Sequence, residues 1–325
     1  MRKSRDIRLF LITELLLGIL VAIFITVLFY DKGKQDKIAV ILSDPGEGKW
    51  ETCIEGIKRC AKNTGTDVVI CNAVNINKSD ELKRLIEEQI KGGANAIIIQ
   101  DIPDGESAEV ARSFSKEIPI VSLEESESPS LERVASVGPD NYEMGVSLAK
   151  SLIEDHAGKL EGKTVGIIVR SFELSSDSKR LQGFTDTLSD TDIRIAWTFA
   201  EDLEDDGMTG IKTYIEAHKK VNIIAAMDST ILESITDAAL AKKVHGALIY
   251  GVGNSEKAIY YLDHEAIVHM AVLDGYAMGY DACAEVTSRL ASKSYKMKNR
   301  SVEYRVLRQN DLFLPENAQF LFTYD

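Results

Sequence analysis

The sequence predicts an α/β protein with two similar halves, preceded by one transmembrane helix. Apolar strand-like runs alternate with amphipathic helix-like runs from residue 37 onward, which is typical of parallel, doubly wound sheets. This alternation is interrupted once, at 134–144, and then restarts. Before it, residues 9–30 form an apolar run long enough to cross a bilayer, which needs ~20 residues.

The run 9–30 contains a single charge, Glu14, among its 22 residues. Basic residues dominate positions 2–8, whereas the lysines after the run are offset by aspartates, so the positive-inside bias places the N-terminus in the cytoplasm and the rest outside. A cleaved signal peptide is the alternative, but the run is long for one, and no small-x-small cleavage site precedes Asp31. We expect 1–36 to be a cytoplasmic tip and a cell-membrane anchor.

The composition limits the remaining possibilities. A length of 325 residues exceeds that of a usual single domain, and the formal net charge of −13 disfavours nucleic-acid binding. Cys53 and Cys60 lie seven apart on one predicted helix, a rise of ~10 Å, which is beyond disulfide reach. The four cysteines show no metal-ligand spacing, so we expect small buried hydrophobes, no metal and no cofactor.

The first half is predicted to alternate strands and helices around a Gly-rich loop at 43–49. The run 37–42, Lys-Ile-Ala-Val-Ile-Leu, has the near-continuous apolar pattern of a strand buried on both faces. Helix 78–91 repeats leucine and isoleucine at helical spacing and ends at Gly92-Gly93, a C-cap signal. The predicted strands are 37–42, 67–71, 96–100 and 119–123, and the predicted helices are 50–63, 78–91 and 106–116.

The stretch 134–144 is predicted to join the two halves. A β-rich run meets Gly138-Pro139, which interrupts regular structure, and Asp140 or Asn141 can then cap a helix over 142–155. Beyond it we expect strands 164–170, 193–199, 223–227, 247–252 and 266–272, helices 178–188, 207–218, 229–241, 256–263 and 276–292, and one or two strands within 302–314.

Three segments resemble catalytic or metal-binding motifs, but none has the residues and spacing that the motif requires. We therefore expect that the protein is not an enzyme. The loop 44–49 carries two carboxylates and lacks the Ser or Thr of a phosphate-binding loop. His264 and His269 would lie ~140° apart around a helix, not on one face as zinc requires. The serines of 175–178 lack the Gly-x-Ser-x-Gly elbow, and the acidic cluster 201–206 is interpreted as a solvated surface.

Polar residues at the carboxyl ends of the strands remain as the candidate ligand site. Carboxylates accept from hydroxyls, arginine donates in a fork, and an aromatic ring covers a C–H face, so the set suits a small polar ligand. The predicted ligand-binding residues are Ser43, Trp50, Gln100, Asp101, Glu124, Glu125, Arg180, Asp228, Asn254 and Asp274.

From residue 37 to about 317 the chain resembles the type I periplasmic-binding-protein family, in its ribose/galactose-like sugar-binding branch. The resemblance rests on the opening strand with Ser43 and on the segments 92–99, 118–121, 138–145 (Gly-Pro-Asp-Asn-Tyr-Glu-Met-Gly), 180–184 and 274–280. It implies two Rossmann-like lobes, 37–137 plus 273–301 and 138–272 plus 302–325. It also implies a three-segment hinge near 134–138, 268–272 and 302–307, which lets the lobes close on a ligand.

The family's ligand positions are only partly matched. Ser43, Trp50 and Arg180 fit them. Sugar binders usually have Asp-Arg after the fourth strand, whereas this chain has Glu124-Glu125. At three other positions the family usually has Asn, Asp and Gln, and this chain has Asp228, Gly253 (beside Asn254) and Val272, respectively. Losing an arginine and gaining a carboxylate makes the pocket more acidic, which favours an amino sugar or another cationic ligand.

Two functions follow from the resemblance and the predicted anchor. The chain is expected to be a binding subunit that delivers a ligand to the permease of an ABC importer. The alternative is a membrane-anchored sensor that acts on a partner such as a histidine kinase. A transcription repressor of the related family would carry an N-terminal helix-turn-helix where this chain has a predicted membrane span. Neighbouring genes for a permease and ATPase, or for a kinase and response regulator, would separate the first two.

Overall fold

The computed structural model describes most of the chain, in two separate units, 1–36 and 37–325. The described residues are 14–22, 24, 35–43, 48–73, 76–125, 130–157, 159–200, 207–242 and 244–322.

In the N-terminal unit, residues 14–22 and 24 are helical. The side chains of Leu15, Leu17 and Leu20 are each about two-thirds exposed (66%, 67% and 67%). No described helix is long and apolar enough to span a membrane. Most of the predicted span 9–30 lies outside the described residues, so the membrane anchor stays a prediction.

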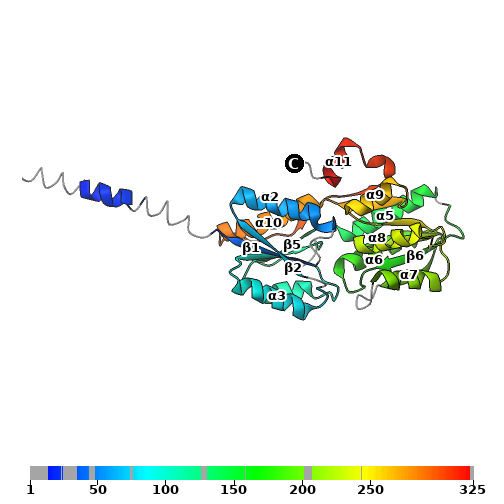
Figure 1. The fold of residues 1–325 in the computed structure, drawn as a ribbon, viewed down its shortest axis with the longest axis horizontal. Helices are drawn as coiled ribbons and strands as arrows, with labels where there is room; N and C mark the ends of the chain where they lie inside the picture. The colour runs from blue at the N-terminus through cyan, green and yellow to red at the C-terminus, as the bar shows by residue number, and fades with distance from the viewer. Residues whose placement is uncertain are drawn as a thin grey trace, which may run out of the picture. The chain divides into compact units, whose positions relative to one another are not determined.

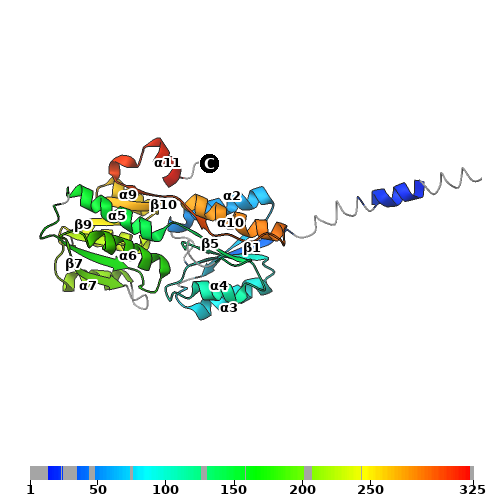
Figure 2. The same ribbon diagram turned by 180° about the vertical axis from the view of Figure 1, so that it is seen from behind.

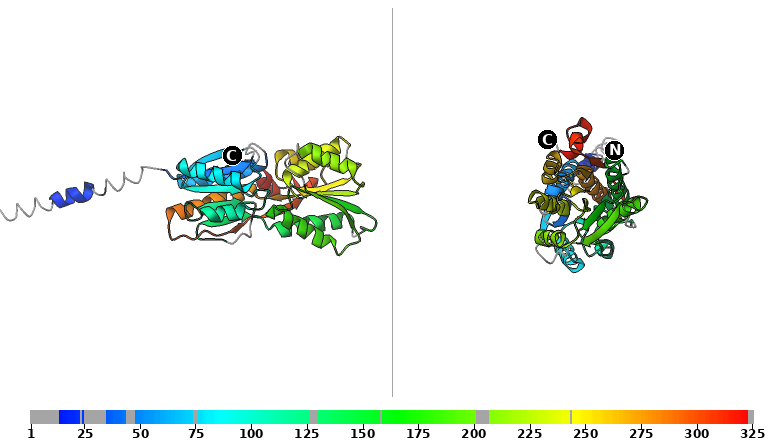
Figure 3. Two further views of the ribbon diagram at one scale, coloured as in Figure 1. Left: turned by 90° about the horizontal axis from the view of Figure 1, so that it is seen from below. Right: turned by 90° about the vertical axis from the view of Figure 1, so that its right-hand side faces the viewer.

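The second unit contains two six-stranded sheets (Figures 1 and 3). The first has the order β11-β5-β4-β3-β1-β2, and all its pairings are parallel. Its strands are β1 (Lys37–Ser43), β2 (Asp67–Ala73), β3 (Ala96–Gln100), β4 (Ile120–Leu123), β5 (Val134–Gly138) and β11 (Arg300–Ser301). The short helix η1 (Gly48–Trp50) leads into α2 (Glu51–Thr64), and the other helices of this group are α3 (Ser79–Lys91), α4 (Ser107–Phe114) and α10 (Gly275–Ala291).

The second sheet has the order β12-β10-β9-β8-β6-β7, in which only β12 is antiparallel to its neighbour. Its strands are β6 (Thr164–Val169), β7 (Arg194–Ala200), β8 (Ile223–Ala226), β9 (Leu248–Val252), β10 (His269–Leu273) and β12 (Tyr304–Leu307). The helices of this group are α5 (Asn141–Asp155), α6 (Ser175–Leu188), α7 (Gly207–Ala217), α8 (Ser229–Leu240), α9 (Glu256–Asp263), the short η2 (Gln309–Asp311) and α11 (Pro315–Leu321). We call the two groups the first and second lobe.

Both sheets are covered on two faces, which explains their strand sequences. In the first lobe α2 and α10 lie side by side on one face, with α3 and α4 on the other (Figures 1 and 2). The residues Ile38 to Leu42 are therefore all fully buried, as their unbroken apolar pattern predicts. One apolar cluster on the α2, α10, α5 and α6 side includes residues of both lobes, such as Val40 and Ile167.

In each lobe two helices cross in close contact at glycines. A Cβ atom at Gly56 or Gly279 would collide with the backbone of the partner helix in the α2–α10 pair. Gly145 and Gly183 occupy the same kind of position between α5 and α6. Only a residue without a Cβ allows helix backbones to approach this closely.

The chain passes between the sheets after β5, after β10 and between β11 and β12. At the first passage the predicted helix start is confirmed, because the Asp140 carboxylate accepts from the Glu143 N–H at 3.0 Å and caps α5.

The prediction of one or two strands within 302–314 is confirmed for one strand, β12. The strand β12 ends at Leu307, and η2 follows it. There the Asp311 carboxylate accepts from the Arg308 N–H at 3.1 Å and turns the chain. Pro315 then begins α11, which suits its fixed φ and missing N–H.

Candidate ligand-binding site

The carboxyl end of the first sheet is organised around Gln100, a buried residue at the end of β3. Its side-chain oxygen accepts from the Ser43 N–H at 2.7 Å and so joins the ends of β3 and β1. The Ser43 hydroxyl in turn accepts from the Ile76 N–H at 3.2 Å. Both predicted residues therefore fix the loops at this edge of the sheet, because their polar atoms are used within the protein.

Asp101 follows β3 and is 6% exposed. Its Oδ1 accepts from the Ser107 hydroxyl at 2.6 Å and from the Ile102 N–H at 3.0 Å. Burial, together with the charges of Glu125 and Glu124, raises the pKa of Asp101 to about 7. The hydrogen bonds from Ser107 and Ile102 act in the opposite direction but are outweighed. Three predicted carboxyl groups therefore share one region of the cleft, and their mutual repulsion would be relieved by a cation.

Glu124 and Glu125 follow β4 in an unusual backbone conformation. Glu124 has a φ of 65°, in the left-handed region that costs a glutamate of order 1 kcal/mol or more. Its carbonyl accepts from the Asn141 side-chain amide at 2.8 Å, and the Gly138 backbone packs against it. Glu125 is 8% exposed. The surrounding structure thus holds this carboxylate pair in place despite the strain.

Asn141 connects that pair to the second lobe. While its amide donates to Glu124, its side-chain oxygen accepts from the Arg180 Nε at 2.8 Å. The Arg180 Nη1 also donates to the Met227 carbonyl at 2.9 Å. A buried guanidinium from α6 is thereby aimed between the ends of β4, β6 and β8.

Two carboxylates of the second lobe face Arg180. Asp177 lies 3.7 Å from its Nη1 and accepts from the Arg170 N–H at 2.7 Å. Burial and the charge of Asp228 raise the pKa of Asp177 to about 7, although Arg180 and Arg170 oppose this. Burial alone would also raise the pKa of Asp228, but the charges of Lys49, Arg170 and Arg180 outweigh it and lower that pKa. Asp228 also caps α8 through the Thr230 N–H at 2.8 Å.

Lys49 brings a positive charge from the first lobe to this cluster. It is buried in η1, with its ammonium 5.2 Å from the centroid of the Trp50 ring. The Asn254 amide of the second lobe donates to the Lys49 carbonyl at 3.0 Å. On another side of the cleft, the Ser171 hydroxyl donates to the Pro103 carbonyl at 2.7 Å. The lobes therefore meet through hydrogen bonds at these two places as well as at Asn141.

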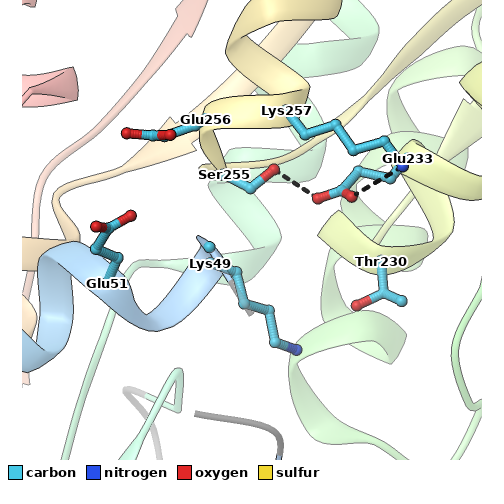
Figure 4. Close-up of a pocket in the computed structure, with 8 residues that line it drawn as sticks. Lys49, Glu51, Thr230, Glu233, Ser255, Glu256 and Lys257 are labelled. Atoms are coloured by element: carbon cyan, nitrogen blue, oxygen red, sulfur yellow. Dashed lines mark hydrogen bonds and ion pairs between the residues drawn. The ribbon is translucent and has the colours of Figure 1, made fainter. Parts of the chain in front are cut away.

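A cavity of about 340 Å³ opens beside Lys49, between the two lobes (Figure 4). Gly48, Lys49 and Glu51 line it from the first lobe, and residues of α8 and α9 line it from the second. Ser255 donates to Glu233 at 2.5 Å, and the Lys257 ammonium lies 3.6 Å from the same carboxylate. None of the predicted site residues lines this cavity. The cavity therefore lies next to the cluster of Arg180, Asp177 and Asp228 and shares only Lys49 with it.

Several buried polar atoms in and beside the cluster have no hydrogen-bond partner among the described residues. Burying a polar atom without a partner costs about 1–3 kcal/mol, so such atoms call for an explanation. They include both donors and acceptors and come from both lobes. They are Trp50 Nε1, Asp101 Oδ2, Ser176 Oγ, Asp177 Oδ1, Arg180 Nη2 and Ser229 Oγ.

Asp274 lies apart from the other predicted residues. It caps α10 by accepting from the Ala277 N–H at 2.8 Å. Burial raises its pKa, and the other charges acting on it are Glu303, Arg305 and Asp281. Its surroundings are thus the passages between the lobes. No observation tests the ligand contacts themselves, so the predicted set remains a prediction.

The structure adds charged residues that the sequence did not single out. Lys49 belongs to a loop considered only for phosphate, and Asp177 to a serine-rich segment considered only for nucleophiles. Arg170 was taken as the last residue of a strand. The available signal was position, because all three follow strands of the sheets, as the predicted residues do.

Comparison with known families decides the class of the protein. The profile of the periplasmic binding protein domain matches residues 38–294. The chain belongs to this family. Its members are solute-binding proteins and not enzymes.

Solved structures agree in fold with this periplasmic binding protein. GanP, a glucose-galactose binding protein from Geobacillus stearothermophilus, is 24% identical with a TM-score of 0.74, covering 86% of this chain and 100% of GanP. A carbohydrate transporter solute binding protein from Agrobacterium radiobacter, in complex with D-arabinose, is 19% identical with a TM-score of 0.78, covering 89% of this chain and all of that one (100%). XylFII in a XylFII–LytSN complex is 18% identical with a TM-score of 0.72, covering 86% and 99%. Curated protein sequences gave no match.

Proposed function

We propose that this periplasmic binding protein closes its two lobes on a small, polar, sugar-like ligand outside the cytoplasm. The observation that carries the proposal is the set of buried, unpartnered donors and acceptors contributed by both lobes. Hydroxyl groups both donate and accept, so a polyol can satisfy arginine and indole N–H groups and carboxylate oxygens at once. A ligand bonded to both lobes stabilises the closed form over the open one.

The charge of the site favours a ligand with an amine, such as an amino sugar. Burial, followed by the charges of Glu125 and Glu124, raises the pKa of Asp101 in the first lobe. The positive charges of Arg170 and Arg180 act instead on Asp177 and Asp228, in the second lobe. A cationic group beside Asp101 would therefore find uncompensated negative charge, while hydroxyls of the same ligand meet Arg180.

Delivery to the permease of an ABC importer is the role we propose for the bound state. The structure bound to D-arabinose and the glucose-galactose binding protein share this fold and support a sugar-like ligand. The XylFII–LytSN complex favours the alternative, a membrane-anchored sensor that presses on a signalling partner such as a histidine kinase. In both roles we propose that 9–30 holds the chain in the cell membrane with its N-terminus in the cytoplasm.

A thermal-shift screen of neutral sugars, polyols, amino sugars and simple amines tests the ligand. A ligand at ~100 times its dissociation constant adds ~2.7 kcal/mol to the free energy of unfolding, which raises the melting midpoint clearly. We expect amino sugars to raise the midpoint more than the matching neutral sugars. If neutral sugars bind and no amine binds, the proposal of a cationic ligand is refuted. If no compound in the panel raises the melting midpoint, the proposal of a sugar-like ligand is refuted.

Membrane attachment is tested by alkaline carbonate extraction of cell membranes. The full-length chain should stay in the pellet, whereas a chain starting at Asp36 should be released. Release of both would contradict the anchor.

A further inference from the structure

The crossing of α2 and α10 places two cysteines of the first lobe opposite each other. The two helices lie side by side in both main views (Figures 1 and 2). Their backbones touch, since a Cβ atom at Gly279 would collide with the Cys53 carbonyl and one at Gly56 would lie 2.8 Å from the Tyr280 nitrogen.

These contacts fix the register of the crossing. Gly275 meets Thr52, and four residues further on Gly56 lies against Tyr276 and Tyr280, which flank Gly279, so the contacting positions advance together along both helices. Cys60 lies four residues after Gly56, and Cys283 lies four residues after Gly279, so each cysteine is one turn further on the contacting face. The register therefore brings Cys60 against Cys283.

Burial and electrostatics agree with this register. Cys60 and Cys283 are 1% and 0% exposed, and both belong to the same apolar cluster. The two thiols act on each other, which lowers the pKa of Cys60 and raises that of Cys283. The two sulfurs are thus within interaction distance, and both cysteines are in the reduced form in this structure.

We propose that Cys60 and Cys283 form an oxidisable pair whose disulfide links α2 to α10. A disulfide needs Cα atoms about 4.4–6.8 Å apart, and the close approach of the two helix backbones one turn away brings Cys60 and Cys283 toward that range. Other pairings are disfavoured by position. Cys53 is separated from Cys60 by a rise of ~10 Å along the same helix, and Cys71 lies on β2, the edge strand.

The reaction is a thiol–disulfide exchange with a small disulfide as oxidant. The Cys60 thiolate attacks one sulfur of the oxidant, which forms a mixed disulfide between Cys60 and that sulfur and releases the other sulfur as a thiolate. The Cys283 thiolate then attacks the Cys60 sulfur and expels the second thiolate. Two electrons pass from the protein thiols to the oxidant, and the two thiol protons end on the two released thiols. Because both thiols are buried in the folded lobe, the exchange takes place while α2 and α10 assemble.

The link would stabilise the first lobe without restraining closure. Both helices belong to that lobe, so the disulfide does not span the passages between the lobes. It closes a very long loop of the unfolded chain, which is the situation in which cross-linking stabilises most.

Refolding the full-length chain in a glutathione redox buffer tests the pair. The protein is then alkylated with N-ethylmaleimide, digested without reduction and mapped by mass spectrometry. We expect peptides containing Cys60 and Cys283 to be joined, with Cys53 and Cys71 alkylated. The oxidised protein should melt about 5 °C or more above the dithiothreitol-reduced protein.

Matched variants separate this disulfide from other effects of oxidation. Cys60→Ala and Cys283→Ala should each abolish the joined peptides and the difference in melting temperature, while Cys71→Ala should keep both. Full alkylation of Cys60 and Cys283 in the refolded wild type, or their linkage to Cys53 or Cys71, would overturn the proposal. That peptide map decides the question even where a variant fails to fold, and it requires no ligand.

Discussion

The side-chain amide of Asn254 donates to the carbonyl oxygen of Lys49 at 3.0 Å, which joins the loop after β9 to the start of α2. Together with the bond from Ser171 to the Pro103 carbonyl, it holds the two lobes against each other. Both acceptors are backbone atoms whose positions are fixed by their own lobe. The arrangement of the lobes in this structure therefore has hydrogen bonds of its own, formed between protein atoms.

The double variant Asn254→Ala/Ser171→Ala should shift the protein toward the open form. Each lost hydrogen bond removes about 1 kcal/mol from the closed state, so ligand affinity should fall by roughly 10-fold or more. Small-angle scattering of the ligand-free protein should show a larger radius of gyration. Ser189→Ala is the control, since its hydroxyl bonds only within its own helix end. An unchanged radius and affinity would exclude a role of these bonds in closure.

Arg180→Met should destabilise the second lobe and abolish ligand binding. It removes the main countercharge of the buried Asp177 and one of the three positive charges that act on Asp228, which costs about 3–5 kcal/mol. Denaturant unfolding measures the loss. The exposed Arg112→Met, which breaks a surface pair with Glu109, should cost no more than ~1 kcal/mol. Adding Asp177→Asn to Arg180→Met should recover part of the stability, and a further loss instead would contradict the pairing.

The stability of the protein should fall as the pH rises from about 4 to 7. The Asp101 carboxyl has a pKa of about 7 in the folded protein, so it keeps its proton there at pH values where the unfolded chain, with a pKa of ~3.9, has lost it. The native state then binds more protons, so the free energy of unfolding decreases through this window and levels off above it. Asp177 contributes with the same sign.

Asp101→Asn isolates the first of these contributions. Asparagine retains an oxygen that can accept from Ser107 but does not titrate. Urea unfolding at several pH values should show a smaller decrease than in the wild type, by an amount of the order of a few kcal/mol. Parallel curves for variant and wild type would show that Asp101 is ionised throughout.

Gly279→Ala should be strongly destabilising because its methyl group collides with the Cys53 carbonyl on α2. The two helices must separate, at a cost of about 1–3 kcal/mol or more. Gly210→Ala is the matched control, since it lies in helix α7 with nothing within 4 Å of its added Cβ. It should stabilise the protein by up to ~1 kcal/mol. Equal effects in thermal unfolding would refute close contact between α2 and α10.

Most of the fold could be predicted because its elements have strong local patterns. The buried strands, such as β1 and β3, read as unbroken apolar runs, and the helix α9 was predicted with its observed bounds. The boundaries near the C-terminus were harder to predict. The end of β12 and the start of α11 depend on the turn at Asp311 and on packing against the second lobe, neither of which has a periodic signal.

The candidate site was harder to predict than the fold. Sequence position identified residues at the ends of strands, but it could not show that Asn141 bridges Glu124 and Arg180. That bridge joins segments far apart in the chain. Nor could it separate Asp274, which caps α10 at a passage between the lobes, from residues that face the cleft. Such distinctions depend on tertiary contacts.

The division of the first sheet between distant parts of the chain has a consequence for biosynthesis. Strands β1 to β5 are made early, but α10 and β11 are made only after nearly all of the second lobe. Until then, the face of the first sheet that α10 will cover stays exposed, and α2 lacks its partner. A nascent chain of this kind therefore cannot complete its first lobe before translation is almost finished.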